Sequence, residues 1–167
     1  MQTNTNICTN IELIVDNDYI RKTMDIIRSA KSEIILSTFK IQTGRNKRTE
    51  VLRDMIQLLN DKLKDGIKIL LLFNWVENFK GVARTNEPVA NSIRACGADV
   101  RYLKDGRCCH SKLLLVDKSK IILGSHNWSA ASLQENYEMS LFIDSVNMAK
   151  ILRDKFMQTF GDAARWL

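Results

Sequence analysis

The sequence predicts an α/β protein with a mixed, largely parallel central sheet flanked by helices on both faces. Strand-like and helix-like segments alternate through most of the 167 residues, the order expected when helices cover a sheet. Residues 67–73 are apolar apart from Lys68, as in a central strand buried on both faces. The apolar fraction is 45% and the chain has one proline. We therefore expect a single domain over residues 1–167 rather than a disordered chain.

The first half of the chain is predicted to hold three strands and two helices. The polar side chains of residues 16–18 offer N-cap oxygens to the first helix. The second helix shows one apolar face at helical spacing, and Gly66 ends it. In chain order the predicted elements are a strand over residues 11–15, a helix over 19–30, a strand over 34–39, a helix over 49–64 and a strand over 67–73.

The second half is predicted to start with a long connection over residues 74–87. Asn86 is then expected to cap a short helix that carries Pro88 in its first turn and ends at Cys96. The remaining elements are strands over residues 99–103, 112–116, 120–123 and 138–143, and a last helix that is capped by Ser145 and runs through Phe160. The strands over 112–116 and 120–123 form a hairpin, which makes the sheet mixed.

The net charge indicates the kind of partner, and the cysteines indicate the cellular compartment. The net charge of +6 suits an anionic partner such as nucleic acid or acidic lipid. The cysteines show no disulfide framework, so we expect reduced thiols in a cytosol; they are Cys8, Cys96, Cys108 and Cys109. The first ten residues are polar and the longest strongly apolar run, residues 69–73, is strand-sized. We therefore expect a cytoplasmic protein without stable membrane insertion.

The most informative motif begins at His110 and Lys112. Asp117 follows Lys112 after four residues, and six residues later comes the sequence Gly-Ser-His-Asn, with Ser125 and Asn127. The set combines a nucleophilic imidazole, a fixed cation and two hydrogen-bond donors for phosphate oxygens. These are the parts needed to attack a phosphodiester without a metal ion or other cofactor.

The pattern resembles the HKD signature of the phospholipase D superfamily. The resemblance covers residues 110–127 without a gap and extends to Asn136-Tyr137-Glu138, since the family commonly places an Asn-x-Glu after its Gly-Ser-x-Asn. It implies an α/β sandwich with the motif at strand ends near the centre of the sheet.

The resemblance also implies that His110 is the nucleophile. Its neutral imidazole would form a phosphohistidine that water then hydrolyses. The second ring nitrogen needs an acceptor, and we expect Glu138 to be that orienting carboxylate. The alternative is that Glu138 is a solvated strand residue.

The other motif residues are expected to hold the phosphate. A strand would place His110 and Lys112 on one face, and Lys112, Ser125 and Asn127 would bind the non-bridging oxygens. Asp117, at the turn, is expected to hold the loop rather than to touch substrate.

One motif supplies only half of the proton chemistry. Departure of the leaving group needs a general acid, and a second imidazole would serve. The only other histidine, His126, lies outside any second H-x-K. Single-motif members of the family are typically small endonucleases that build one site across a homodimer axis. We therefore expect a homodimer in which two copies of His110 face each other.

Several residues near the motif have two interpretations. Cys108 and Cys109 invite a zinc site, but adjacent cysteines point apart on a strand, so packing beside the catalytic strand is favoured. His126 either lines the cleft or is a partly exposed loop residue. Trp128 is expected in the core, with base stacking as the alternative.

A basic segment follows the second predicted strand. It contains Lys40, Arg45, Lys47 and Arg48. Such a cluster is either a solvated surface or, at this end of the sheet, a binding site for a phosphate backbone.

The leading interpretation is an endonuclease that acts on DNA, with RNA as a further substrate. Three other functions remain open. A phospholipase D acting on phosphatidyl lipids or cardiolipin would use the same reaction centre. Residues 75–82 are the one weak candidate for a membrane-contacting element. The others are a non-catalytic nucleic-acid-binding module, and the nuclease subunit of a larger complex.

Overall fold

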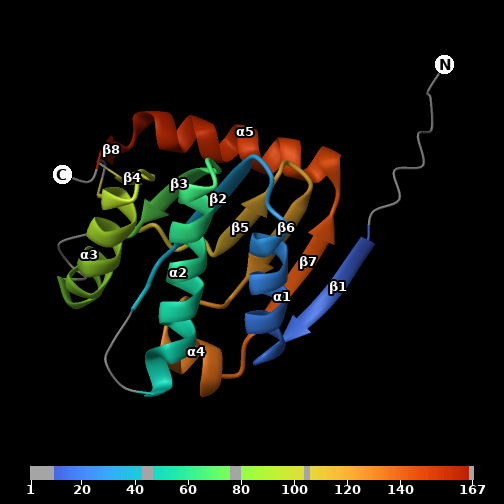
Figure 1. The fold of residues 1–167 in the computed structure, drawn as a ribbon, viewed down its shortest axis with the longest axis horizontal. Coiled ribbons are helices and arrows are strands. Elements are labelled where there is room, and N and C mark those ends of the chain that lie inside the picture. The colour runs from blue at the N-terminus through green and yellow to red at the C-terminus, as the bar shows by residue number, and fades with distance from the viewer. Residues whose placement is uncertain (1–9, 43–46, 76–79, 104–105, 166–167) are drawn as a thin grey trace.

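A computed structural model describes residues 10–42, 47–75, 80–103 and 106–165 of the chain (Figure 1). Its elements alternate as the sequence predicts. In chain order they are β1 (Asn10–Val15), α1 (Asp18–Arg28), β2 (Glu33–Thr38), a 3-10 turn η1 (Lys47–Thr49), α2 (Glu50–Lys64), β3 (Lys68–Phe73), α3 (Lys80–Ala95), β4 (Asp99–Tyr102), β5 (Leu113–Val116), β6 (Lys120–Gly124), α4 (Ala130–Gln134), β7 (Met139–Asp144), α5 (Val146–Asp162) and β8 (Ala164–Arg165).

The described strands form one eight-stranded sheet in the order β1-β7-β6-β5-β2-β3-β4-β8. This confirms the mixed α/β class, but the expectation of a largely parallel sheet was wrong. Only β2 with β3 and β3 with β4 pair in parallel among the described strands. The connection between β5 and β6 is too short for a parallel crossover, so these strands form an antiparallel hairpin, and β7 also pairs antiparallel with β6.

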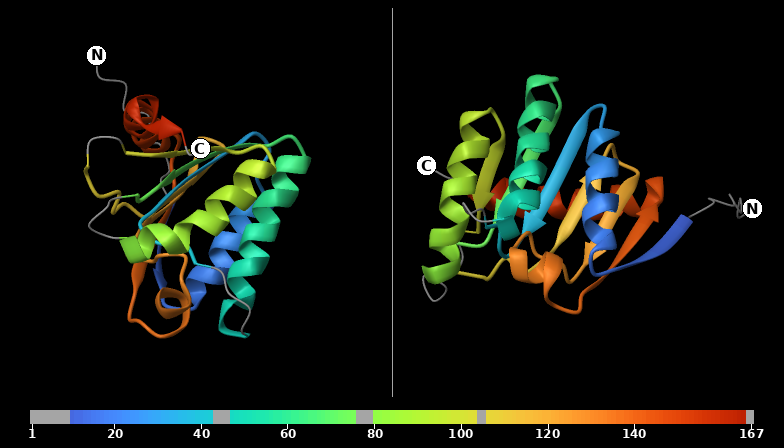
Figure 2. Two further views of the ribbon diagram at one scale, coloured as in Figure 1. Left: turned by 90° about the vertical axis from the view of Figure 1, so that its left-hand side faces the viewer. Right: turned by 60° about the horizontal axis from the view of Figure 1, so that its bottom comes forward.

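Helices cover both faces of the sheet, and each face has its own core. Figure 2 shows α1, α2 and α3 on one face and α5 on the other. The larger core packs helix residues such as Ile27 and Leu59 against Leu36 and Leu71 of the sheet. The smaller core packs Phe156 and Phe160 of α5 against the opposite side of the same strands. The alternation of side chains along each strand thus fills two cores.

Helix α5 crosses the sheet at the end where β2 begins. Arg153 of α5 donates two hydrogen bonds to the buried carboxylate of Glu33, with Nε–Oε2 and Nη2–Oε1 distances of 2.6 and 3.0 Å. This bidentate ion pair is a strong and directional contact. The helix begins where expected, because the side chain of Ser145 accepts a hydrogen bond from Met148 N.

The connection over residues 74–87 is shorter than expected. Helix α3 already begins at Lys80, so Pro88 lies inside the helix rather than in its first turn. Asn86 is not a cap, because its side chain is buried and bonds to segments outside the helix. The Asn-x-Pro pattern resembles a helix start, and tertiary hydrogen bonds use the same asparagine differently.

One further local expectation, the capping of α1, is wrong, and two short elements add to the predicted set. Residues 16–18 do not cap α1 through a side chain; Asp16 has a positive φ of 47° and its carboxylate accepts from Glu138 N. The short helix α4 and the two-residue strand β8 were not expected. Among the described residues, no helix is both long and apolar enough to cross a bilayer.

Candidate active site

The motif residues other than Asp117 meet at the sheet end where β2, β3 and β6 finish and β5 and β7 start. Trp128 N donates to Lys40 O at 3.1 Å and Gln42 N donates to Trp128 O at 2.8 Å, so the segments after β2 and β6 are joined. Gly124 N donates to Lys112 O at 3.3 Å, which joins the start of β5 to the end of β6. This end lies opposite the contact between α5 and β2.

His110 and Lys112 lie together just before β5 rather than within it. Lys112 Nζ is 3.2 Å from His110 Nδ1 and donates to His110 O at 2.6 Å. The ring of Phe39, after β2, is tilted against the imidazole with 4.9 Å between ring centroids. Lys112 Nζ also lies 5.5 Å from the Phe39 ring centroid. An aromatic ring thus backs both groups and holds them side by side.

A buried asparagine fixes the backbone that carries the histidine. Asn74 follows β3 directly, is fully buried and accepts a hydrogen bond from Cys109 N at 3.1 Å. Ser37 of β2 bonds to Ser111 on the other side of His110. Sequence reasoning did not identify these residues. The available signal was a polar residue at the carboxyl end of a strand that is apolar after Lys68.

Asn86 joins three chain segments around the same point. Its Oδ1 accepts from Ile41 N at 2.8 Å, and its Nδ2 donates to Phe39 O at 3.0 Å and to Asn74 O at 3.1 Å. The residue is fully buried. One side chain of α3 therefore sets the positions of both Phe39 and Asn74, the two groups that support the histidine segment.

Glu138 is the centre of a second network, which differs from the expected one. Its buried carboxylate accepts hydrogen bonds from Ser125 Oγ, from Ser132 Oγ at 2.8 Å and from Asn136 Nδ2 at 3.1 Å. It does not hold the ring of His110 among the interactions of the described residues, and it is not a solvated strand residue either. Its geometry suits the orientation of Ser125.

Asn127 and Gly124 are held by the same backbone junction. Asn127 Oδ1 accepts from Lys40 N at 3.2 Å, and Asn127 N donates to Ser132 Oγ at 2.8 Å. The carbonyl end of the amide is thus occupied, and its NH₂ end has no hydrogen-bond partner among the described residues. A Cβ atom on Gly124 would lie 2.4 Å from Ser140 Cα, so the expected close backbone approach at this glycine is confirmed.

The electrostatics favour an uncharged imidazole beside a cation. Burial, with the charge of Lys112 second, lowers the pKa of His110 below its ordinary value of 6.5. Burial also lowers the pKa of Lys112. Burial alone would raise the pKa of Glu138, but the three hydrogen bonds that it accepts lower it. Both shifts act in one direction: they favour the neutral form of His110 and the ionised form of Glu138.

The comparisons with known proteins agree with this geometry. The family model described as the phospholipase D-like domain of cardiolipin synthase matches residues 23–160. The chain belongs to the phospholipase D superfamily. Mouse mitochondrial cardiolipin hydrolase is 31% identical over 64 residues, which are 38% of this chain and 29% of that protein. The human protein is 31% identical over a stretch that is 25% of its length. The aligned region is thus under a third of either relative.

Solved structures of the phospholipase D superfamily share the whole fold. Nuc from Salmonella typhimurium, a phospholipase D family member, superposes with a TM-score of 0.80 at 17% identity, over 95% of this chain and 98% of that one. NucT from Helicobacter pylori gives 0.73 at 17% identity, over 95% and 99% of the two chains. At such identities the likeness concerns the fold.

Asp117, the last residue of the superfamily's three-letter signature, lies away from His110. Its carboxylate accepts from Lys31 N at 2.7 Å, from Ser32 N and Oγ at 2.8 Å each and from Glu33 N at 3.1 Å. Asp117 and Lys118 both have positive φ, as in a tight hairpin turn. Asp117 therefore ties the β5–β6 turn to the start of β2, at the opposite end of the sheet from the site.

His126 and Trp128 are both buried in the superfamily domain. His126 stacks on Tyr19 at 4.3 Å between centroids, and its ring nitrogens bond to Ser140 Oγ and Asp16 O. Both expectations for His126, as a cleft residue and as a partly exposed one, were wrong. Trp128 is 1% exposed and donates to Tyr19 Oη, which confirms core packing and excludes base stacking.

The basic segment is only partly arranged around the site. Lys40 supplies its backbone to Asn127, and its side chain is half-buried. Lys47 and Arg48 are exposed at η1, and Arg48 pairs with Glu135 just after α4 at 3.1 Å. Arg45 lies outside the described residues. Arg48 therefore contacts α4 and the residue after it, in the segment that follows Asn127.

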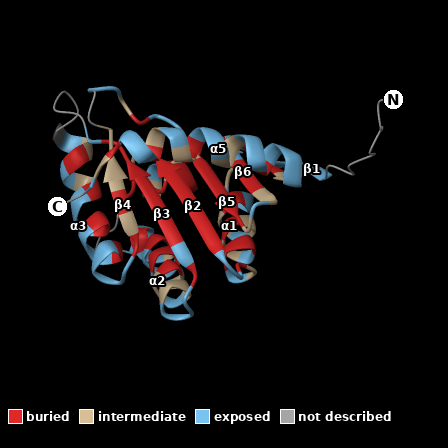
Figure 3. Ribbon diagram, turned by 90° about the horizontal axis from the view of Figure 1, so that it is seen from above, coloured by how far each residue is buried: buried red, intermediate tan, exposed pale blue. Residues whose placement is uncertain are grey.

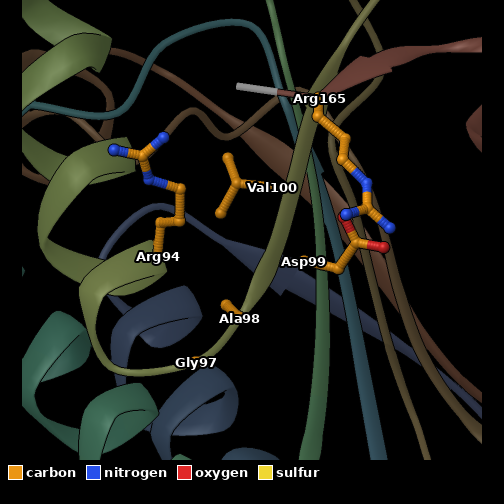
Figure 4. Close-up of a pocket in the computed structure, with 6 residues that line it drawn as sticks. All are labelled: Arg94, Gly97, Ala98, Asp99, Val100 and Arg165. Atoms are coloured by element: carbon orange, nitrogen blue, oxygen red, sulfur yellow. The ribbon is translucent and has the colours of Figure 1, made fainter. Parts of the chain in front are cut away.

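The expected alternatives near the motif were a metal site and cysteine packing beside the catalytic strand. The described residues contain no group of three or more His, Cys, Asp or Glu side chains placed to hold a metal ion. Cys109 is buried and 3.3 Å from Ser37 Oγ, which confirms packing beside the motif. A pocket lined by Arg94, Gly97, Ala98, Asp99, Val100 and Arg165 lies where β4 begins, at the sheet end remote from His110 (Figure 4).

Proposed function

We propose that the protein is a metal-independent phosphodiesterase that cleaves nucleic acid, with DNA as the first substrate to test and RNA as the second. The observation that carries the proposal is the pairing of His110 with Lys112 at 3.2 Å, at a sheet end that also presents Ser125 and Asn127. A neutral imidazole beside an ammonium can attack an anion that the ammonium holds.

The reaction has two displacements at phosphorus. A ring nitrogen of His110 attacks, an N–P bond forms, and the P–O bond to the leaving alkoxide breaks as an acid protonates that oxygen. Water then attacks the phosphohistidine, the N–P bond breaks, and the phosphomonoester leaves as a proton passes to a base. Lys112, Ser125 and the amide NH₂ of Asn127 stabilise the charge on the phosphate oxygens in both steps.

The acid is supplied by a second copy of the chain. The other histidine, His126, is buried in hydrogen bonds to Ser140 and Asp16 and is not available. A two-fold homodimer would place the second His110 at the same phosphate. One imidazole would then act as nucleophile while its partner donates the proton, so the rate would have a bell-shaped pH dependence.

Net charge supports nucleic acid as the substrate. The chain carries +6, and Lys47 and Arg48 are exposed on the segment that contacts α4 next to the site. A phosphate backbone would gain from such cations.

A second candidate function is hydrolysis of cardiolipin or a related phosphatidyl lipid. The matching family model is named for cardiolipin synthase, and the aligned curated relatives are mitochondrial cardiolipin hydrolases. The same phosphohistidine chemistry would serve a lipid phosphodiester. A direct comparison of substrates decides between the two.

One assay tests the reaction and the substrate together. Wild type, His110→Ala and the control Lys118→Ala, an exposed turn variant, are incubated in EDTA with supercoiled plasmid, RNA or cardiolipin vesicles. We expect plasmid nicking by wild type and the control, and loss by His110→Ala. Lipid turnover without nicking would favour the second candidate, and dependence on magnesium would contradict the mechanism.

Mixing subunits tests whether the site is shared. His110→Ala protein is co-refolded with an equal amount of wild type. If each site needs both copies of His110, activity per wild-type chain falls to about half, so the mixture retains about a quarter of the activity of an all-wild-type sample. Independent sites would retain about half.

Trapping tests the covalent intermediate. Reactions with labelled substrate that are stopped in acid and at neutral pH should differ in the amount of labelled protein, since phosphohistidine is acid-labile.

A further inference from the structure

Two aromatic side chains that the proposed reaction does not use lie at the same sheet end as the candidate site. Trp75 follows Asn74 just after β3, and Tyr102 is the last residue of β4. Their rings are tilted at 55° with 6.4 Å between centroids, within the range that aromatic pairs favour. Trp75 is 36% exposed and Tyr102 is half-buried. Tyr102 therefore backs an indole ring that reaches solvent.

Strand order brings this aromatic pair next to the reacting groups. Figure 3 shows β2, β3 and β4 side by side, and their parallel pairing places their carboxyl ends along one edge. Phe39, which follows β2, contacts the ring of His110. Asn74 accepts a hydrogen bond from Cys109 N at 3.1 Å, so Trp75 and His110 each follow one member of this bonded pair. Neighbouring strands are about 4.8 Å apart, so the ends of β2 and β4 are separated by about 10 Å, which a few nucleotides of a strand span.

The surroundings of the pair suit a nucleic acid better than a membrane. The segment that leads from Tyr102 to His110 carries the exposed Arg107, and Lys112 follows on the other side of the imidazole. Cations that track phosphates beside an aromatic ring that stacks on bases are the usual means of holding a single strand. Among the described residues from 68 to 103, Trp75 is the only exposed large hydrophobic side chain. A lipid contact would need a larger apolar surface.

We propose that Trp75, backed by Tyr102, stacks on an unpaired nucleobase near the scissile phosphate and so favours single-stranded nucleic acid. The inference rests on the proposed function for the class of ligand. Every base has a flat face, so stacking on an indole distinguishes unpaired from paired bases without selecting a sequence. In a duplex the bases are already paired and stacked on their neighbours, and freeing one costs free energy. A strand held by Lys112 at its phosphate and by Trp75 at a base would be fixed at two points.

Strands with and without bases test the stacking. His110→Ala is the background, because a bound strand is then not cut, and Trp75→Ala, Trp75→Phe or Val146→Ala is added to it. Val146 is 66% exposed at the start of α5, at the opposite end of the sheet, and its variant is the control. The probes are a fluorescein-labelled oligothymidylate of about twelve nucleotides, an abasic strand of equal length and the matching duplex. Fluorescence anisotropy measures the dissociation constant, and circular dichroism measures folding.

We expect Trp75→Ala to weaken binding of oligothymidylate on the order of tenfold, and Trp75→Phe, which keeps a ring, by about threefold or less. The abasic strand should bind every variant within about twofold, because its phosphate contacts are unchanged. Binding of the duplex should change as little, since its bases are not free to stack. Val146→Ala should bind all three probes as the background protein does. Because no probe is cut, a base-dependent loss in Trp75→Ala supports the stacking even if the wild-type protein cleaves no nucleic acid.

Several results would overturn the inference. Unchanged oligothymidylate binding by folded Trp75→Ala would remove the stacking site, and cleavage of the strand by wild type would then leave the proposed function standing. Equal weakening for the oligothymidylate and the abasic strand would show that Trp75 supports the phosphate contacts and not a base. Failure of the background protein to bind the oligothymidylate would remove the ligand. Loss of co-flotation with cardiolipin vesicles in Trp75→Ala, with oligothymidylate binding unchanged, would make the ring a lipid contact.

Discussion

The side-chain oxygen of Asn74 accepts a hydrogen bond from the backbone N–H of Cys109 at 3.1 Å, across 35 positions of sequence. This bond fixes the residue before His110 to the end of β3. Asn86 in turn donates to the backbone oxygen of Asn74. Two buried amides thus set the place of the imidazole without touching it.

Asn74→Ala should impair the chemistry more than substrate binding. The change leaves the buried N–H of Cys109 unpaired, which costs about 1–3 kcal/mol of unfolding free energy. A displaced His110 should lower kcat about tenfold or more, with a smaller change in KM. Steady-state kinetics and thermal unfolding measure the two effects. The exposed control Asn147→Ala should change neither, and an unchanged kcat in Asn74→Ala would refute the positioning role.

Gly124→Ala should be strongly destabilising. The added Cβ would lie 2.2 Å from Ser140 Oγ and 2.5 Å from Met139 O, and backbone atoms cannot move away cheaply. We expect a loss of about 3 kcal/mol in unfolding free energy, measured by urea denaturation. Gly81→Ala is the control, because α3 leaves open space at Gly81 and alanine should stabilise that helix by about 0.5–1 kcal/mol. Equal effects at the two glycines would contradict the packing argument.

Asp117→Ala should weaken the fold without altering the reacting groups. The carboxylate accepts bonds from Lys31, Ser32 and Glu33, and the loss of these charge-assisted bonds should cost about 2–4 kcal/mol. At a temperature where the variant is folded, KM and kcat should stay within about twofold of wild type. The surface control Asp65→Asn should be near neutral in stability. A large fall in kcat in folded Asp117→Ala would show a role in the reaction.

The pKa of His110 should lie below that of an ordinary histidine. Burial and the Lys112 charge both lower its pKa from 6.5. The neutral, attacking form of His110 therefore persists to lower pH, and the fall in rate on the acid side of the pH profile should also occur at lower pH. Lys112→Met should raise the pKa of His110, because it removes the cation. Nuclear magnetic resonance of the ring protons measures this without activity, with Lys118→Met as control. A rise in the control, or none in Lys112→Met, would contradict the assignment.

His126 should make the protein less stable in mild acid. Burial lowers the pKa of His126, and the Asp16 carbonyl and the charges of Glu138 and Asp16 offset this only in part. The unfolded chain then binds more protons than the folded one, so unfolding free energy falls as pH drops from about 6.5 towards the lower folded pKa. His126→Gln should show a flatter dependence over that window by urea denaturation. Parallel curves for the two proteins would exclude His126 as the source.

The sequence predicted elements best where a local pattern and the tertiary structure agree. The Ser145 hydroxyl has no other partner in the part of the chain that the structure describes, and it caps α5 as expected. Asn86 carries an equally good cap signal, yet it serves Phe39, Asn74 and Ile41 instead. Local spacing cannot reveal that a buried amide has better partners 45 residues away. Spacing also does not reveal that the carboxylate of Glu138 accepts hydrogen bonds from Ser125, Ser132 and Asn136.

Sequence alone determined the α/β class, the family resemblance and the spacing that brings His110 and Lys112 together, because these depend on residues a few positions apart. The tertiary structure decided the strand directions, the support of His110 by Phe39 and Asn74, the burial of His126 and the hydrogen bonds that Glu138 accepts. Each of these depends on contacts between strands and helices that are distant in the chain, and such contacts exist only once the sheet has formed.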